Sequence, residues 1–268
     1  MSTRMPAVAG LFYPGQTVAL RQLVEELLAA ALDSKQQHLK VLVVPHAGYV
    51  YSGALAARAY SLLADRRTSI RRVVLLGPAH RVWVPGLALP TSTAFATPLG
   101  DIEIDTELAA ALRVLPGVAM SDAAHAGEHS LEVQLPFLQT ALDEFTLLPL
   151  VVGEATPGHV AAVLEQVWGG DETLIVISTD LSHFHDLATA RGIDAATAAA
   201  IESFSMDLHG EQACGAVLLN GLLQLARQRA VRIERIGLAT SADTVGSADR
   251  VVGYGAWWLD DRSQERVA

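Results

Sequence analysis

Basic residues are scarce in this chain of 268 residues, where 19 Lys and Arg stand against 29 Asp and Glu and the formal net charge is −10. A protein that binds nucleic acid or an anionic membrane needs a surplus of positive charge to neutralise phosphates. The composition therefore argues against both a nucleic-acid partner and a membrane-surface partner.

Cysteine is rarer still, because Cys214 is the only one in the sequence. A single cysteine cannot form an internal disulfide, which is typical of a reducing compartment. No apolar stretch reaches the ~20 residues that a membrane helix needs. Pro6, Gly10 and Pro14 interrupt the N-terminal region in which a signal peptide would lie. We expect a soluble, cytoplasmic protein.

Hydrophobic residues, in contrast, are plentiful and make up 51% of the chain. A chain of this length can fill one large domain or two modest ones. No linker, low-complexity tract or internal repeat divides the sequence. We predict a single domain over residues 1–268.

Apolar runs alternate with helical patterns along most of the chain. The runs at 40–44, 72–76 and 173–179 are bounded by Gly or Pro, as expected for strands buried on both faces. Helical periodicity occupies 17–32, 52–63, 130–142, 157–167, 187–204 and 213–227. This alternation predicts the α/β class, as a three-layer α/β/α sandwich with a mainly parallel central sheet.

Two further segments are less regular. The apolar run 145–153 also reads as a strand, but Pro149 cannot donate to a ladder and favours an edge position. Residues 82–105 combine turn residues with short alternations, which predicts an inserted hairpin or pair of strands.

Titratable side chains follow three of the predicted strands. His46 comes after the first, His80 after the second, and Asp180, His183 and His185 after the third. Ligands of open α/β sheets bind beyond the carboxyl ends of the strands, and imidazole both binds metals and transfers protons near neutral pH. A single histidine after a strand is often only a turn residue. Finding the pattern at three strand ends favours a functional site.

Two other positions allow two interpretations each. Glu128 and His129 precede Ser130, which could cap a helix whose N-terminus favours negative charge, or they could form a ligand or acid–base pair. Cys214 opens a helix-like stretch, where a thiol can have a lowered pKa. From spacing alone, however, a lone cysteine is more often a small buried apolar residue. His125 is expected to be solvated.

Several motifs in order resemble the Memo family, the middle component of the bacterial and archaeal AmmeMemoRadiSam gene set. They begin with Pro45-His46-Ala-Gly48-Tyr49, Leu76-Gly77-Pro78-Ala-His80, Thr97-Pro98-Leu-Gly100 and Glu128-His129-Ser130-Leu-Glu132. They continue with Ser178-Thr-Asp180-Leu-Ser-His183, Cys214-Gly215 and Val252-Gly253-Tyr254-Gly255. The resemblance extends from about residue 5 to residue 258.

The resemblance implies a fold similar to that of class III extradiol dioxygenases, which use non-haem iron(II). It also implies that His46, His80 and Cys214 hold a metal and that His183 takes the place of the acid–base histidine. A thiolate here would replace the carboxylate of the dioxygenase iron site, and thiolate is a soft ligand. We therefore expect iron(II) or copper, with Glu128 as an alternative third ligand.

The leading hypothesis is a metal-dependent redox enzyme that acts on oxygen or a small organic substrate. Its catalytic residues would be His183, Glu128, His129 and Asp180. The alternative is a non-catalytic module that binds a peptide or protein in an enzyme-like crevice. Metal-free hydrolysis ranks last, since no Gly-x-Ser-x-Gly elbow is present. The resemblance further implies the Amme component and a radical SAM enzyme as partners.

Overall fold

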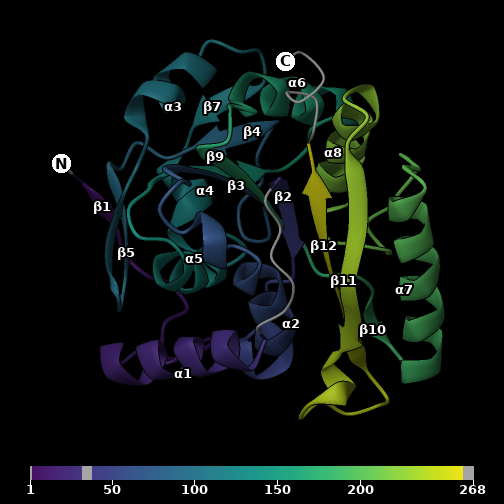
Figure 1. Ribbon diagram of the computed structural model, residues 1–268. Helices are drawn as coiled ribbons and strands as arrows, with labels where there is room; N and C mark the ends of the chain where they lie inside the picture. The colour runs from purple at the N-terminus through teal and green to yellow at the C-terminus, as the bar shows by residue number, and fades with distance from the viewer. Residues whose placement is uncertain (1, 32–37, 262–268) are drawn as a thin grey trace.

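The computed structural model describes residues 2–31 and 38–261, which form an α/β sandwich around a nine-stranded sheet (Figure 1). The main path of the sheet runs β10-β12-β2-β9-β3-β8-β4-β7, and β11 pairs with β12. The strands of this sheet are β2 (Leu39–Val44), β3 (Arg72–Pro78), β4 (Leu87–Leu89), β7 (Val118–Met120), β8 (Thr146–Val152), β9 (Thr173–Ser178), β10 (His183–His185), β11 (Arg232–Thr240) and β12 (Val251–Asp260).

Helices cover both faces of this sheet. The α-helices are α1 (Thr17–Ala30), α2 (Tyr49–Ser61), α3 (Thr106–Leu112), α4 (Asp122–Ala126), α5 (Leu135–Ala141), α6 (Pro157–Val167), α7 (Leu187–Glu202) and α8 (Ala216–Gln228). Short 3-10 helices are η1 (Ala64–Arg66), η2 (Glu132–Gln134) and η3 (Ser241–Asp243). The sequence placed α6 at the observed bounds, whereas the predicted helix 130–142 divides into η2 and α5.

The four central strands, β2, β9, β3 and β8, are parallel. Their side chains alternate between two hydrophobic clusters, since Leu42 and Val44 of β2 belong to one and Val41 and Val43 to the other. Residues of α1, α2 and α5 complete the first cluster, and residues of α3, α6, α7 and α8 complete the second. The predicted three-layer architecture and its central parallel strands are therefore confirmed.

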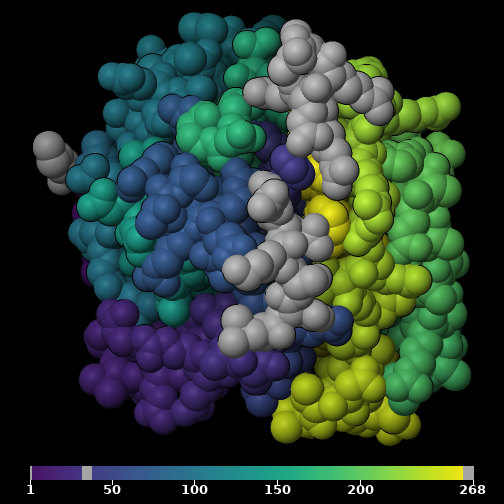
Figure 2. Space-filling view, viewed as in Figure 1, coloured from purple at the N-terminus to yellow at the C-terminus, as the bar shows by residue number. Residues whose placement is uncertain are grey.

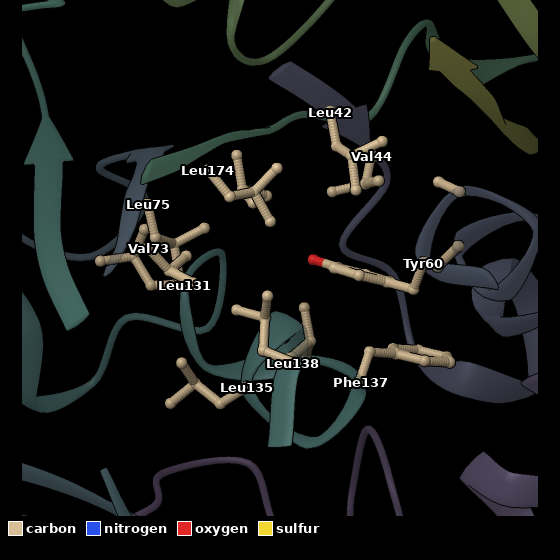
Figure 3. Packing of buried hydrophobic residues seen from close by; sticks show 14 of the residues in the cluster. Leu42, Val44, Tyr60, Val73, Leu75, Leu131, Leu135, Phe137, Leu138 and Leu174 are labelled. Carbon is tan, nitrogen blue, oxygen red and sulfur yellow. The ribbon is translucent and has the colours of Figure 1, made fainter. Parts of the chain in front are cut away.

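The first cluster carries the largest rings. Tyr60 of α2 stacks on Phe137 of α5, with ring centroids 5.2 Å apart and planes 8° from parallel. Figure 3 shows both rings beside Leu138, with the Tyr60 oxygen pointing into the cluster. A buried tyrosine hydroxyl needs a hydrogen-bond partner, and the partner of Tyr60 is Gln134, which connects this core to the site.

The expectation that Pro149 marks an edge strand is wrong, because β8 lies between β3 and β4. Its missing N–H is tolerated for a geometric reason. The carbonyl of Leu147 points away from β3 and accepts the N–H of Asp105. Backbone groups point to alternate sides along a strand, so the nitrogen of Pro149, two residues further on, also points away from β3. On that side β4 pairs only with Val151 and Val152, so no ladder bond is required at Pro149.

Residues 82–105 do contain the predicted hairpin, formed by β5 (Ala94–Thr97) and β6 (Gly100–Glu103). Together with β1 (Thr3–Arg4) it makes a second, three-stranded sheet. The long antiparallel pair β11–β12 was not anticipated from the sequence. Figure 2 shows β11, in yellow-green, along the surface beside the green α7. Among residues 2–31 and 38–261, no helix is both long enough and apolar enough to cross a bilayer.

Candidate metal centre

The three strand ends predicted to share a site lie at one edge of the sheet. Strand β9 pairs in parallel with β2 on one side and with β3 on the other. The carboxyl ends of these strands therefore deliver His46, Asp180 and His80 to neighbouring positions. The rings of His46 and His80 meet edge to face, with centroids 5.1 Å apart. The prediction of a shared edge is confirmed.

A third imidazole joins this pair from a loop. His129 follows α4, and its ring centroid lies 5.4 Å from that of His46 and 4.7 Å from that of His80. One ligand atom from each of the three histidines lies within 4.8 Å of the others. Spacing of this order allows one cation to contact all three nitrogens after small side-chain adjustments. The sequence named His129 as an acid–base candidate and did not place it with the two metal ligands.

His46 is almost entirely buried, and its contacts fix its orientation. Its backbone N–H donates to Asp180 Oδ1 at 2.7 Å, and its Nδ1 lies 3.0 Å from Ser178 Oγ. Burial lowers the pKa of His46 well below its usual value, and nearby His80 and His129 lower it further. His46 is therefore a neutral imidazole at pH 7, which is the form that binds metals.

Glu128 holds His80 at two points. Its Oε2 accepts the backbone N–H of His80 at 2.6 Å, and its Oε1 lies 2.9 Å from His80 Nδ1. Burial alone would raise the pKa of Glu128, but hydrogen bonds from His80 and from the Ser130 N–H bring it down to about 2. The ionised carboxylate can only accept, so His80 Nδ1 is the donor and Nε2 is left free. Carboxylate–histidine pairs of this kind commonly orient metal ligands.

His129 is positioned differently, because its Nδ1 is buried and has no hydrogen-bond partner among residues 2–31 and 38–261. This nitrogen lies 3.3 Å from Glu128 Oε1 outside hydrogen-bond geometry, and Phe12 packs on the ring with centroids 4.9 Å apart. Burial, followed by His80, lowers the pKa of His129 to about 4. An unpartnered buried nitrogen beside two other imidazoles fits a position that a cation would satisfy.

Cys214 lies against the same cluster from the segment before α8. Its Sγ is 3.4 Å from His46 Nε2 and accepts the Asp180 N–H at 3.3 Å. The expected lowering of its pKa is wrong for the metal-free protein, because burial and the nearby Asp180 carboxylate raise the pKa to about 12. The thiol therefore keeps its proton unless a cation displaces it. The sulfur contacts His46, but Cys214 does not belong to the group of three residues whose ligand atoms all lie within 4.8 Å of one another, so its role as a ligand stays a prediction.

Two acidic or basic side chains complete the surroundings. Burial raises the pKa of Asp180 to about 7, against the opposing hydrogen bonds from the His46 and Ala47 backbone. His183 begins β10, where it pairs with Val252 of β12, and burial lowers its pKa. Its strand partner β12 also pairs with β2, the strand that His46 follows, which places His183 on the same side of the sheet as that strand.

Two other histidines considered in the sequence analysis lie outside the group formed by His46, His80 and His129. His185 belongs to β10 but is outside the group of three. His125 was expected to be solvated, and this is wrong, since the residue is 1% exposed and its Nε2 donates to the Ala88 carbonyl at 3.0 Å. The ring of Phe95 lies against it edge to face, with centroids 5.6 Å apart. Ser130 also does not cap a helix, because its hydroxyl donates to the Pro78 carbonyl at 2.9 Å.

The donor set fits a transition metal. His80 offers a free Nε2, His129 has an unpartnered nitrogen, and a thiol contacts the Nε2 of His46. Imidazole and thiolate ligands suit iron, copper and zinc, whereas magnesium and calcium prefer oxygen. His46, His80 and His129 would hold such an ion, with Cys214 as the further donor.

Sequence reasoning gave no role to Ser178, Gln134 or the pair formed by Arg4 and Glu132. Gln134 carried a readable signal, because an amide inside the apolar stretch Leu131–Leu138 has to find buried partners. Arg4 and Glu132 are 128 positions apart in the chain, so their pairing had no local signal.

The comparison with protein families decides the family. A model described as "Memo-like protein" matches residues 4–258. This chain belongs to the Memo family. A MEMO1 family protein of Archaeoglobus fulgidus is 33% identical over 263 residues, which cover 94% of this chain and 97% of that relative.

Two other Memo relatives are similarly close. The MEMO1 family proteins of Methanopyrus kandleri and Aquifex aeolicus are 36% and 35% identical, with 94% and 95% of this chain and 97% and 98% of the relatives covered. A solved structure of an uncharacterised protein from Escherichia coli K12 matches with a TM-score of 0.48 at 13% identity, covering 81% of this chain and 99% of that one. In this Memo protein the motifs around His46, His80 and Glu128 come together at one edge of the sheet.

Proposed function

We propose that this Memo protein is a redox enzyme whose cofactor is one redox-active metal ion, iron(II) or copper. The observation that carries the proposal is the convergence of His46, His80 and His129, whose ligand atoms lie within 4.8 Å of one another. Three imidazoles with a thiol beside one of them form a donor set for such a metal. When bound, the ion would supply one-electron chemistry and a position for oxygen or a small organic molecule.

The surrounding residues would orient the ligands and move protons. Glu128 fixes the ring of His80 through Nδ1, and burial around His46 excludes water from one side of the site. His183 is half-buried at the same edge, and its imidazole could act as the proton donor or acceptor of the reaction. Asp180 holds the backbone of His46 and so sets the direction of that ligand.

Metal content is the first measurement. Protein purified anaerobically without chelator would be analysed by mass spectrometry beside His46→Ala, His129→Ala and Cys214→Ser. We expect near-stoichiometric iron or copper in the parent and at least tenfold less in both histidine variants. His209→Ala is the matched control, because His209 is exposed and outside the cluster.

The cysteine variant identifies the remaining ligand. Retention of the metal by Cys214→Ser would remove the thiol from the donor set, and loss would support it. If the parent contains no metal and takes up neither ion when offered, the metal proposal fails. Oxygen consumption by the loaded protein, with a reductant supplied, then tests whether bound metal turns over.

A second candidate is a module that binds a peptide or protein, because exposed apolar side chains lie close in the chain to residues of the site. Leu11, Trp83 and Phe184 are 81%, 73% and 61% exposed. Each lies within three residues of Phe12, His80 or His183 in the chain. Exposed aromatic and aliphatic side chains beside a site favour contact with an apolar partner. Trp83→Ala in this case weakens partner binding while His46→Ala leaves it intact. The Amme component and a radical SAM enzyme are candidate partners on the resemblance alone.

A further inference from the structure

The hydrogen atom on the His46 ring can be assigned from the buried groups around it. His46 Nδ1 lies 3.0 Å from Ser178 Oγ, and either atom could be the donor in this contact. In a neutral imidazole only one ring nitrogen carries hydrogen. The direction of this one hydrogen bond therefore decides whether Nε2, which faces Cys214, has a lone pair to offer.

Gln134 fixes one end of the network. Its Nε2 lies 2.9 Å from the Pro45 carbonyl oxygen and 2.9 Å from Ser178 Oγ. A carbonyl oxygen can only accept, so the amide nitrogen must face Pro45. The opposite amide orientation would place two acceptors against each other in a dry interior. Ser178 Oγ is therefore an acceptor from Gln134.

Tyr60 confirms this orientation from the other side of the amide. Its hydroxyl donates to Gln134 Oε1 at 2.9 Å. Figure 3 shows that this hydroxyl points into an apolar cluster formed by leucines and valines. The tyrosine hydrogen has the Gln134 oxygen as its acceptor there, so the amide orientation satisfies both residues.

Ser178 has a single hydroxyl hydrogen, and it is already used. Its Oγ lies 2.6 Å from the carbonyl oxygen of Ser130, which can only accept. The serine oxygen therefore has no hydrogen left for His46. Its remaining lone pair can only accept from Nδ1, so Nδ1 carries the hydrogen and Nε2 is bare.

We infer that Ser178 and Gln134 are positioning residues that set the Nδ1–H tautomer of His46 and so keep its Nε2 available as a metal ligand. The role in metal binding rests on the proposed function, whereas the tautomer assignment rests only on the network. His80 reaches the same tautomer by a different partner, the carboxylate of Glu128. Two of the three imidazoles are thus oriented before any metal arrives, which lowers the cost of binding.

The tautomer can be read directly by NMR. Protein labelled with ¹⁵N-histidine and freed of metal would be measured at neutral pH through long-range correlations between ring protons and nitrogens. The protonated ring nitrogen resonates well upfield of the bare one, and the spectrum of His46→Gln identifies the signal. We expect the Nδ1–H form for His46 in the parent protein. A predominant Nε2–H form overturns the inference without any variant.

Ser178→Ala then tests the cause. Without the acceptor we expect a growing Nε2–H population and an affinity for added iron(II) or copper that falls tenfold or more. Gln134→Met should give a smaller change in the same direction, because it removes the amide that donates to Ser178 Oγ but leaves the serine hydroxyl itself in place. The matched control is Ser92→Ala, since Ser92 is buried and its hydroxyl has no partner. It should change neither reading.

The outcomes separate this inference from the proposed function. An unchanged His46 tautomer in folded Ser178→Ala overturns the role of Ser178, even if metal binds. The expected tautomer in a parent that binds neither iron(II) nor copper leaves the assignment standing and refutes the metal proposal. If Ser178→Ala does not fold, the parent spectrum and Gln134→Met still decide the assignment.

Discussion

Glu128 and Glu132 lie in one short segment, are both almost fully buried, and have opposite kinds of partner. Glu128 accepts from His80 and from the backbone of His129 and Ser130. Glu132 instead pairs with the guanidinium of Arg4 and accepts from the Ala7 and Val8 N–H groups at 2.7 and 2.9 Å. Tyr13 adds its hydroxyl at 2.5 Å.

The two carboxylates differ in whether the residue they bind keeps an atom available as a metal ligand. Every partner of Glu132 belongs to residues 4–13, so this group fastens the N-terminal segment to the core. Each of the three guanidinium nitrogens of Arg4 donates a hydrogen bond, to Glu132, to the His125 carbonyl at 3.0 Å and to the Glu128 carbonyl at 2.7 Å. Glu128, in contrast, fixes the backbone N–H and one ring nitrogen of His80 and leaves the other ring nitrogen available to a metal. The same segment thus provides an anchor, Glu132, which holds the N-terminal residues, and a support, Glu128, which orients the candidate ligand His80.

The largest expected loss of stability comes from removing the anchoring carboxylate of Glu132. Glu132→Ala leaves the buried Arg4 charge unpaired, and we expect the free energy of unfolding to fall by about 3 to 5 kcal/mol. Urea unfolding followed by circular dichroism measures this loss. The affinity of the folded protein for metal should change less than threefold. A large loss of affinity in folded Glu132→Ala would erase the distinction between the two carboxylates.

The anchor should also respond to acid through His125, whose carbonyl accepts from Arg4. Burial lowers the pKa of His125 from 6.5 to about 4, so between these values the unfolded chain binds more protons than the folded one. Its contribution to stability is therefore present above pH 6.5 and is lost as the pH falls toward 4. From pH 7 to pH 4.5 we expect a loss of about 2 to 3 kcal/mol from this residue.

His125→Gln isolates that contribution, because the amide nitrogen can still donate to the Ala88 carbonyl. Urea unfolding at the two pH values should show a smaller drop in the variant than in the parent. His209→Ala, which changes an exposed histidine, should reproduce the drop of the parent. Equal drops in all three proteins would contradict the buried, neutral assignment of His125.

Substitution of Glu128 should show the reverse pattern, with a large loss of metal affinity and a small loss of stability. Glu128→Gln removes the negative charge next to His80 while keeping an oxygen in place, and we expect metal affinity to fall 10- to 100-fold. Competition with a chelator of known affinity measures the change. The loss of stability should be smaller than for Glu132→Ala. If stability falls more than affinity, Glu128 is an anchor as well.

Tyr13→Phe offers the smallest test on the anchor side. It removes one of several donors to Glu132 and should lower the free energy of unfolding by about 1.5 kcal/mol. Metal affinity should be unchanged. Since the ring also packs on Tyr49 with centroids 5.6 Å apart, the phenylalanine retains the apolar contact. A change in affinity would show that the N-terminal segment orients the site.

The features predictable from sequence were those encoded locally. Continuous apolar runs identified β2, β3 and β9, and the titratable residue after each strand placed His46, His80 and Asp180 together. The family resemblance added Cys214, whose sulfur lies beside His46. The placement of His46, His80 and Asp180 succeeds because the carboxyl ends of neighbouring parallel strands share one edge. The role of Cys214 as a ligand stays a prediction.

The features that escaped depend on contacts between distant segments. His129 reaches the other imidazoles from a loop whose path no periodicity encodes. Pro149 is accommodated inside the sheet only because β4 is short on that side. The buried state of Cys214, and with it a raised pKa, follows from packing around Asp180 and could not be read from its place before a helix.

The position of β12 has a consequence for how the protein is made. This strand, residues 251–260, inserts between β11 and β2, although β2 ends at Val44. It also pairs with β10, which carries His183. During synthesis His183 therefore lacks its strand partner until residues near Val252 have left the ribosome. The edge that carries the site is therefore completed only after the other strands of the described sheet have been synthesised, as expected for pairings of such high sequence separation.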